Sequence, residues 1–303
     1  MKLLLILTVI FLFLSCTDDK PCEKNLCYNH GKCQTNGRCL CDVGYNPPYC
    51  NECAEGYFLD SNNICSETSS EYMVSFKSSE FDMGCSDESC NLPIEKSHKV
   101  KLSEFSIDKY EVSTKDYKKC VDAKVCKEPI SNVVNNYCNY GDSSRDEHPI
   151  NCIKWSDAND YCLWLHKRLP TEAEWEFVAK GKDNRIYPWG NEKPSCKYLM
   201  MFNGKAGCGI DRTAKGGLKK DGQTPDGIYD MSGNVWEWTS DWYDKDYYSK
   251  SPIEDPKGAD KGIFKVTRGG GFLFNDIKYY RTTYRGYAHP EKSSPAIGFR
   301  CVR

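Results

Sequence analysis

The segment that decides the fold of this chain begins with Arg268-Gly269-Gly270-Gly271-Phe272-Leu273-Phe274-Asn275-Asp276, and the chain ends with Gly298-Phe299-Arg300-Cys301-Val302-Arg303. Three consecutive glycines disfavour a stable helix, and they permit positive φ and a close approach of the backbone. The aromatic and arginine side chains after them must therefore project from turns and short strands. Such a segment forms either the floor of a binding site or the inner wall of a core, and buried aromatic residues are the commoner case.

The size and charge of the chain narrow its possible functions. At 303 residues, we expect one main domain with an additional small module. The formal net charge is −2, and lysine and arginine are scattered along the sequence. We therefore expect no nucleic-acid partner, because such a partner requires a concentrated basic patch.

The 19 cysteines are the strongest compositional signal. A reducing cytosol rarely contains so many unless they bind zinc, and the sequence lacks CxxC pairs at matched spacing. We therefore expect an oxidising, extracytoplasmic compartment and a fold that is crosslinked by disulfides.

The N-terminus has the composition of a signal peptide over residues 1–15. Lys2 precedes an apolar run from Leu3 to Leu14, which is shorter than the roughly 20 residues that cross a bilayer. The ending Leu12-Phe13-Leu14-Ser15-Cys16 resembles a bacterial lipoprotein cleavage box, in which the cysteine carries the lipid. This resemblance implies lipidation of Cys16, a tether over residues 16–21 and anchoring to a membrane of the bacterial cell envelope. With Cys16 removed from pairing, an even number of cysteines remains.

A small cysteine-rich module follows over residues 22–65, and its first six cysteines are Cys22, Cys27, Cys33, Cys39, Cys41 and Cys50. Six cysteines allow fifteen pairings, so spacing alone assigns none of them. With Gly44-Tyr45 between the last two, the spacing resembles an epidermal-growth-factor-like (EGF-like) module. The resemblance implies the pairs Cys22–Cys33, Cys27–Cys39 and Cys41–Cys50. Cys53 and Cys65 are expected to close a further loop, and the polar residues 66–80 are interpreted as a linker.

Residues 81–303 predict a domain of mixed strands and helices. A strand is expected to end at residues 81–84, before a turn closed by Cys85 and Cys90, and residues 100–110 alternate as another strand. Helices are expected over residues 115–123 and after the caps Ser156 and Thr171.

The third of these helices carries the clearest signals at both ends. Thr171 and Glu174 form a capping-box pattern, and Gly181 marks the end. Because Trp175 belongs to the apolar stripe of this helix, Glu172 and Glu176 are expected on its solvent side, where the helix dipole explains them.

Five motifs occur in a fixed order in this part of the chain. They are Arg168-Leu169-Pro170-Thr171-Glu172-Ala173-Glu174-Trp175-Glu176, Tyr187-Pro188-Trp189-Gly190-Asn191, Tyr229-Asp230-Met231-Ser232-Gly233-Asn234-Val235-Trp236-Glu237-Trp238, Arg268-Gly269-Gly270 and Gly298-Phe299-Arg300-Cys301. Together they resemble the formylglycine-generating enzyme (sulfatase-modifying factor) family. The resemblance implies an α+β domain over residues 81–303 with an irregular, C-type-lectin-like fold that is rich in loops and disulfides.

The same resemblance implies that copper-dependent oxidation is absent. Active members of the family carry two cysteines, five residues apart, after the Arg-Gly-Gly motif, and these bind copper(I). Counting from Arg268, those positions hold Phe274 and Tyr279. Copper(I) prefers thiolates, which neither ring can replace. No copper is therefore expected, and no catalytic residue is assigned.

A structural calcium site is implied at the Gly-Asn-Val-Trp-Glu-Trp motif. Carried over from the family, its ligands are the carboxylates of Asp230 and Glu237 and the carbonyls of Gly233 and Val235. Oxygen ligands from a glycine-containing loop suit a hard cation such as calcium. The alternative is that Glu237 only binds amides of its own loop.

The ten cysteines of the large domain can be paired completely. The family resemblance implies Cys162–Cys301, and proximity in the sequence suggests Cys85–Cys90, Cys120–Cys126, Cys138–Cys152 and Cys196–Cys208. A loop of over a hundred residues closed by Cys162–Cys301 contributes about 4–5 kcal/mol in the entropy model.

Three functions follow from these observations. The first is a ligand-binding module for an unknown glycan or protein, with a surface formed by Phe274, Asn275, Tyr279, Tyr280 and Tyr287. The second is an oxidoreductase of altered chemistry, using non-haem iron or another group, for which the five histidines show no ligand spacing. The third is a purely structural module in which Phe274 and Tyr279 fill the former cleft.

Overall fold

The computed structural model describes residues 31–33, 39–41, 57–59, 65–67, 73–85, 90, 93–131 and 136–303. The chain forms two compact units, Met1–Ser69 and Ser70–Arg303. In the first unit, β1 (Gly31–Cys33) pairs with β2 (Cys39–Cys41), and β3 (Tyr57–Leu59) pairs with β4 (Cys65–Glu67). The expected signal peptide and Cys16 lie outside the described residues, and each expected EGF-like disulfide pair includes a cysteine outside them. Within the described residues, no helix combines the length and apolar character needed to cross a membrane.

A four-stranded sheet organises the second unit, with the strand order β11-β10-β9-β12. Its strands are β9 (Trp236–Trp242), β10 (Lys265–Arg268), β11 (Gly286–Ala288) and β12 (Ile297–Gly298). β10 is antiparallel to both β9 and β11, whereas β12 is parallel to β9. The last two motifs of the sequence therefore flank the Trp-Glu-Trp motif in space.

Two strand pairs precede this sheet in the chain. β5 (Met73–Phe76) pairs with β8 (Phe105–Asp108), and β6 (Ser79–Met83) pairs with β7 (His98–Leu102). The domain therefore begins before residue 81, because β5 and the first residues of β6 lie within the expected linker. The strand expected over residues 100–110 is also divided in two. Ser103 interrupts it, and its backbone N–H and hydroxyl both donate to Asp255.

The three expected helices are α1 (Thr114–Asp122), α2 (Trp155–Trp164) and α3 (Glu172–Lys180). Short 3-10 turns connect the elements at Pro93–Glu95, Ser143–Arg145, Ala206–Gly209, Lys220–Gly222, Tyr247–Ser249 and Ile277–Tyr280. The capping box of Thr171 and Glu174 and the ending at Gly181 are confirmed. The start of α2 differs from the prediction: the N-cap is Lys154, without a side-chain cap, and the indole of Trp155 donates to the Thr239 carbonyl instead.

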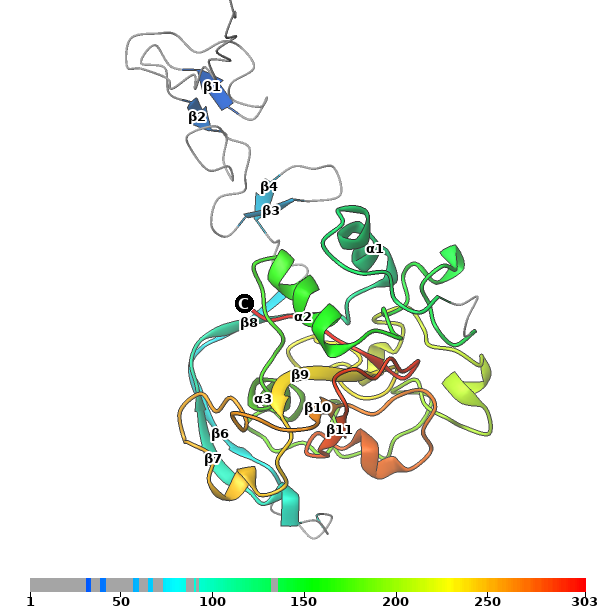
Figure 1. Cartoon of the computed structure of the whole chain (residues 1–303). Coiled ribbons are helices and arrows are strands. Elements are labelled where there is room, and N and C mark those ends of the chain that lie inside the picture. Colours follow the sequence, from blue (N-terminus) through cyan, green and yellow to red (C-terminus); the bar gives the residue numbers. More distant parts are fainter. Residues whose placement is uncertain are drawn as a thin grey trace, which may run out of the picture. The chain divides into compact units, whose positions relative to one another are not determined.

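Helix α3 is buried on every side, because β6, β7, β9 and β10 all contact it (Figure 1). Its Phe177 ring packs against Phe81 at a centroid distance of 5.2 Å. The expectation that Glu172 and Glu176 face solvent is wrong, since both are buried. The apolar stripe alone could not reveal this, because the groups that neutralise both carboxylates come from the C-terminal segment.

Five disulfides crosslink the described part of the large domain: Cys85–Cys90, Cys120–Cys126, Cys138–Cys152, Cys162–Cys301 and Cys196–Cys208. These are the pairs that the sequence suggested. Cys162–Cys301 ties α2 to the end of the chain, which lies beside β8 in Figure 1. So many disulfides indicate an oxidising, extracytoplasmic environment.

Candidate functional site

The triple glycine turns the chain sharply after β10. Gly269 and Gly270 have φ values of 96° and 74°, in the left-handed region that favours glycine. A Cβ on Gly270 would lie 2.6 Å from the Tyr280 ring, so only glycine permits this close approach. The turn therefore brings the residues after Gly271 back over the start of β9.

Four aromatic rings meet there, and we name them the aromatic cluster: Trp236, Phe274, Tyr279 and Tyr284. The ring centroids of Phe274 and Tyr279 are 5.4 Å apart, and those of Trp236 lie 5.7 Å from Phe274 and 5.9 Å from Tyr279. Tyr284 packs 5.0 Å from Tyr279. Most of these pairs are edge-to-face, the geometry that the ring quadrupole favours. Trp236 is buried, and the other three rings are half-buried.

The five residues predicted to bind a ligand do not form one surface. Phe274 and Tyr279 are half-buried in the aromatic cluster, and Asn275 beside them is exposed. Tyr280 is fully buried, and its hydroxyl donates to the carbonyls of Gly271 and Phe274. This corrects the prediction for Tyr280, which supports the turn rather than a surface.

Tyr287 lies on β11 among other neighbours. Its ring is 54 % exposed and packs against Tyr243 and Phe264. Tyr284 takes the place in the aromatic cluster that the prediction gave to Tyr280. Its aromatic character was the only signal in the sequence that could have identified it.

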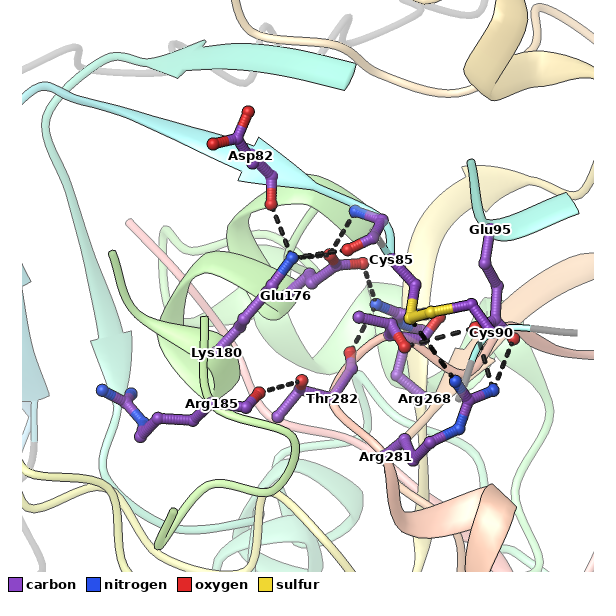
Figure 2. The surroundings of a disulfide bond; sticks show 12 residues. Asp82, Cys85, Cys90, Glu95, Glu176, Lys180, Arg185, Arg268, Arg281 and Thr282 are labelled. Atoms are coloured by element: carbon purple, nitrogen blue, oxygen red, sulfur yellow. Dashed lines mark hydrogen bonds and ion pairs between the residues drawn. A yellow bond between two sulfur atoms is a disulfide. The ribbon is translucent and has the colours of Figure 1, made fainter. Parts of the chain in front are cut away.

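Buried arginines from the same segment form ion pairs with acidic residues far away in the sequence. Arg285 binds both oxygens of Glu172 at 2.8 and 2.9 Å, and Arg281 binds both oxygens of Glu95 at 3.1 and 2.9 Å. Arg268 donates to Glu176 at the centre of this network (Figure 2). The Arg285–Glu172 pair is bidentate, whereas Nη2 of Arg281 alone contacts both oxygens of Glu95. Together these ion pairs give the C-terminal segment a fixed position.

The pKa values of these carboxyl groups reflect two opposing effects. Burial acts to raise the pKa of Glu172, but the charges of Arg285 and Arg268 outweigh it and bring the pKa below its ordinary value. Burial prevails at Glu95 and raises its pKa, although Arg281 acts in the opposite direction. The network is therefore a structural frame for the segment.

Two of the residues expected to bind calcium, Asp230 and Glu237, lie near Arg300. Arg300 donates to both oxygens of Glu237 at 2.8 and 2.7 Å, and the indole of Trp175 donates to the same carboxylate at 2.8 Å. Asp230 accepts a hydrogen bond from the backbone N–H of Gly217. Glu237 therefore binds side chains from α3 and the C-terminal segment rather than amides of its own loop.

A third buried carboxylate, Glu111, joins this group and was not identified from the sequence. It accepts hydrogen bonds from the Asn234 side chain and the Val235 backbone. Burial raises the pKa of Glu111 well above its ordinary value and that of Asp230 to about 6. Three buried carboxylates thus lie near one guanidinium, and oxygen ligands of this kind are those that a hard cation prefers. Within the described residues, no three His, Cys, Asp or Glu side chains form a ready metal-binding group.

Comparison with known proteins places this geometry in context. Residues 61–303 match the family described as "Sulfatase-modifying factor enzyme 1-like domain". The formylglycine-generating enzyme of Streptomyces coelicolor is 38 % identical over 176 residues, which cover 53 % of this chain and 54 % of that enzyme. The "Inactive C-alpha-formylglycine-generating enzyme 2" of Bos taurus is 34 % identical over 173 residues, which cover 52 % of this chain and 50 % of that protein. The chain thus spans about half the length of these relatives.

Among solved structures, PvdO from Pseudomonas aeruginosa is similar to this chain with a TM-score of 0.62. The similarity covers 76 % of this chain and 93 % of PvdO at 22 % sequence identity. At this identity, the likeness supports the loop-rich α+β fold alone.

Proposed function

The chain belongs to the sulfatase-modifying factor (formylglycine-generating enzyme) family, and we propose that its large domain is a ligand-binding member without copper-dependent oxidation. The observation that carries this proposal is the contact between the Phe274 and Tyr279 rings. The family resemblance places the copper-binding cysteines at these two positions. Soft monovalent copper has no thiolate ligand there, because the single cysteine between Arg268 and Arg303 is Cys301, which is paired with Cys162.

The ligand surface proposed is the exposed side of the aromatic cluster. Phe274, Tyr279 and Tyr284 are half-buried, so each ring keeps part of its area for a ligand, and Asn275 supplies an exposed amide beside them. Half-buried rings provide contact area at little entropic cost, and an amide adds directional hydrogen bonds. A glycan or a protein surface is the class of ligand that this combination suits.

The relatives support a function without catalysis in one respect. The family includes a protein named as inactive, which is 34 % identical to this chain. Loss of activity is therefore compatible with keeping the fold. This chain carries the five motifs in the order that the family resemblance implies, but it has an aromatic pair at the two positions where that resemblance places the copper-binding cysteines.

The experiment is a glycan-array and pull-down screen with the purified chain, followed by alanine substitution. We expect Phe274→Ala and Tyr279→Ala to weaken ligand binding while the melting temperature falls by no more than about 5 °C, because both rings are only half-buried. Tyr287→Ala, outside the aromatic cluster, is the matched control and should leave binding unchanged. A large loss of melting temperature with Phe274→Ala would favour the purely structural function instead. Metal analysis tests the oxidoreductase alternative, because stoichiometric copper or iron would support it.

Calcium and a lipid anchor complete the proposal. Calcium would be held by Asp230, Glu237 and the carbonyls of Gly233 and Val235, where it would neutralise negative charge of the buried carboxylates.

The lipoprotein-like ending at Cys16 supports attachment of the mature chain to a membrane of the bacterial cell envelope. Mass spectrometry of the N-terminal peptide tests the lipid, and its absence from Cys16 would refute the anchor.

A further inference from the structure

The disulfide Cys85–Cys90 borders the buried arginine network, away from the aromatic cluster. Cys85 lies two residues after the end of β6, and its sulfur lies 3.7 Å from Nη1 of Arg281 (Figure 2). Both cysteines are half-buried, so the bond is not sealed in the core as Cys162–Cys301 is. A guanidinium group beside a sulfur atom stabilises that sulfur as a thiolate.

The network behind this disulfide carries more positive than negative charge among the described residues. Its carboxylates are Glu95, Glu172 and Glu176, and its cations are Lys180, Arg268, Arg281 and Arg285. All seven side chains are buried. The four cations share these three carboxylates, so a thiolate at Cys85 would add negative charge beside Arg281.

We propose that Cys85–Cys90 is an exchangeable disulfide that a dithiol reductant opens, with Cys85 as the leaving thiolate. A thiolate of the reductant attacks Sγ of Cys90, the Cys85–Cys90 bond breaks, and the electron pair leaves on Sγ of Cys85 beside Arg281. The second thiol of the reductant then attacks the mixed disulfide and releases Cys90, which takes a proton from water. The reductant ends as a disulfide, and the protein gains two electrons.

A second half-buried disulfide serves as an internal control. Cys196 and Cys208 are both half-buried, but Sγ of Cys208 lies 3.3 Å from the carbonyl oxygen of Leu199. A carbonyl oxygen disfavours a thiolate, whereas a guanidinium favours one. Because a better leaving group speeds exchange, Cys85–Cys90 should open faster by about tenfold or more.

The experiment uses the oxidised, full-length protein and limiting dithiothreitol as the dithiol probe. Samples are alkylated at intervals, and peptide mass spectrometry gives the rate for each disulfide. A Cys85–Cys90 rate about tenfold above the Cys196–Cys208 rate supports the proposal, and equal rates overturn it. With the monothiol glutathione, the trapped adduct should sit on Cys90 with Cys85 free; equal adducts on both cysteines contradict the assignment of Cys85.

Substitutions separate the effect of the guanidinium from exposure of the bond. Glu95→Gln removes the charge that Arg281 shares and should speed opening by about threefold or more. Arg281→Met should slow the opening of the disulfide, but this change alone leaves the buried Glu95 without its guanidinium partner. The double variant Glu95→Gln with Arg281→Met leaves no unpaired carboxylate at residue 95, and its disulfide should open more slowly than that of Glu95→Gln alone. An equal rate in the two variants overturns the role of Arg281. Residues 86–89 stay unchanged in every variant, so the comparison isolates the guanidinium charge.

Discussion

The ring of Phe274 stands nearly perpendicular to the ring of Tyr279, with centroids 5.4 Å apart and an interplanar angle of 79°. The two residues are five positions apart, and the turn at Gly269-Gly270 and the bonds of Tyr280 bring them together. The same backbone would bring two cysteines together at these positions. The loss of copper binding that we propose therefore requires a change of only these two side chains on a retained backbone.

Restoring the thiols should restore metal binding. In the double variant Phe274→Cys with Tyr279→Cys, we expect one copper(I) ion per chain, measured by competition with a chromogenic copper(I) chelator under anaerobic conditions. The wild-type chain and each single variant are the controls and should bind at least about tenfold more weakly, because one thiolate cannot form the two-coordinate site that copper(I) favours. Equal binding by wild type and double variant would place the copper elsewhere.

Calcium should stabilise the chain measurably. The buried carboxylates Glu111, Asp230 and Glu237 repel one another although Arg300 lies near them, and a bound cation would remove part of this repulsion. A calcium concentration one hundred times the dissociation constant should raise the free energy of unfolding by about 2.7 kcal/mol. Differential scanning calorimetry with calcium or a chelator measures this, and the Asp230→Asn variant should respond less. Identical melting curves for wild type in both conditions would refute the site.

The buried carboxyl group of Asp241 should lower the stability of the folded chain as pH rises from about 4 to about 7. Burial first, and then the charge of Glu172, raises its pKa from 3.8 to about 7. A group whose pKa is raised on folding stabilises the folded state below its unfolded pKa, and this stabilisation disappears as pH passes the folded pKa.

The Asp241→Asn variant tests this dependence. The carboxylate accepts hydrogen bonds from the Glu172 backbone and the Ser240 hydroxyl, and the amide oxygen of Asn can accept both. We expect the variant to lose up to about 4 kcal/mol of the pH dependence between pH 4 and 8. Urea unfolding at several pH values provides the measurement, and an unchanged slope would contradict the raised pKa.

The long-range disulfide should contribute more to the free energy of unfolding than the short ones. Cys162–Cys301 joins residues 139 apart, whereas Cys120–Cys126 joins residues 6 apart. In the entropy model, replacing the first pair by Ala costs about 5 kcal/mol and replacing the second about 2 kcal/mol. Chemical unfolding of the two double variants compares them, and the reverse order would show that loop entropy does not dominate here.

The sequence predicted those features that depend on neighbouring residues. The capping box of α3 needs only Thr171 and Glu174, and the short disulfides need only proximity along the chain. The burial of Glu172 and Glu176 was missed because their partners, Arg285 and Arg268, lie about a hundred residues later. An amphipathic stripe reports apolar side chains, and it gives no sign of carboxylates that are neutralised inside the core.

The candidate site was likewise predicted only in part from the sequence. The family pattern predicted the positions of Phe274 and Tyr279, and both rings lie in the aromatic cluster. The burial of Tyr280 was missed because it follows from its contact with Gly270, which depends on a turn that residue type alone does not specify. Glu111 was missed because it comes more than a hundred residues before the loop that it supports.

The most direct test is an assay for formylglycine on a sulfatase-type peptide containing the substrate cysteine. The purified wild-type chain is incubated with the peptide, oxygen, a reductant and copper(I), and mass spectrometry follows the conversion of cysteine to formylglycine. The aromatic pair at Phe274 and Tyr279 predicts no conversion above the protein-free control. Formylglycine formation by the wild-type chain that depends on added copper(I) would contradict the account.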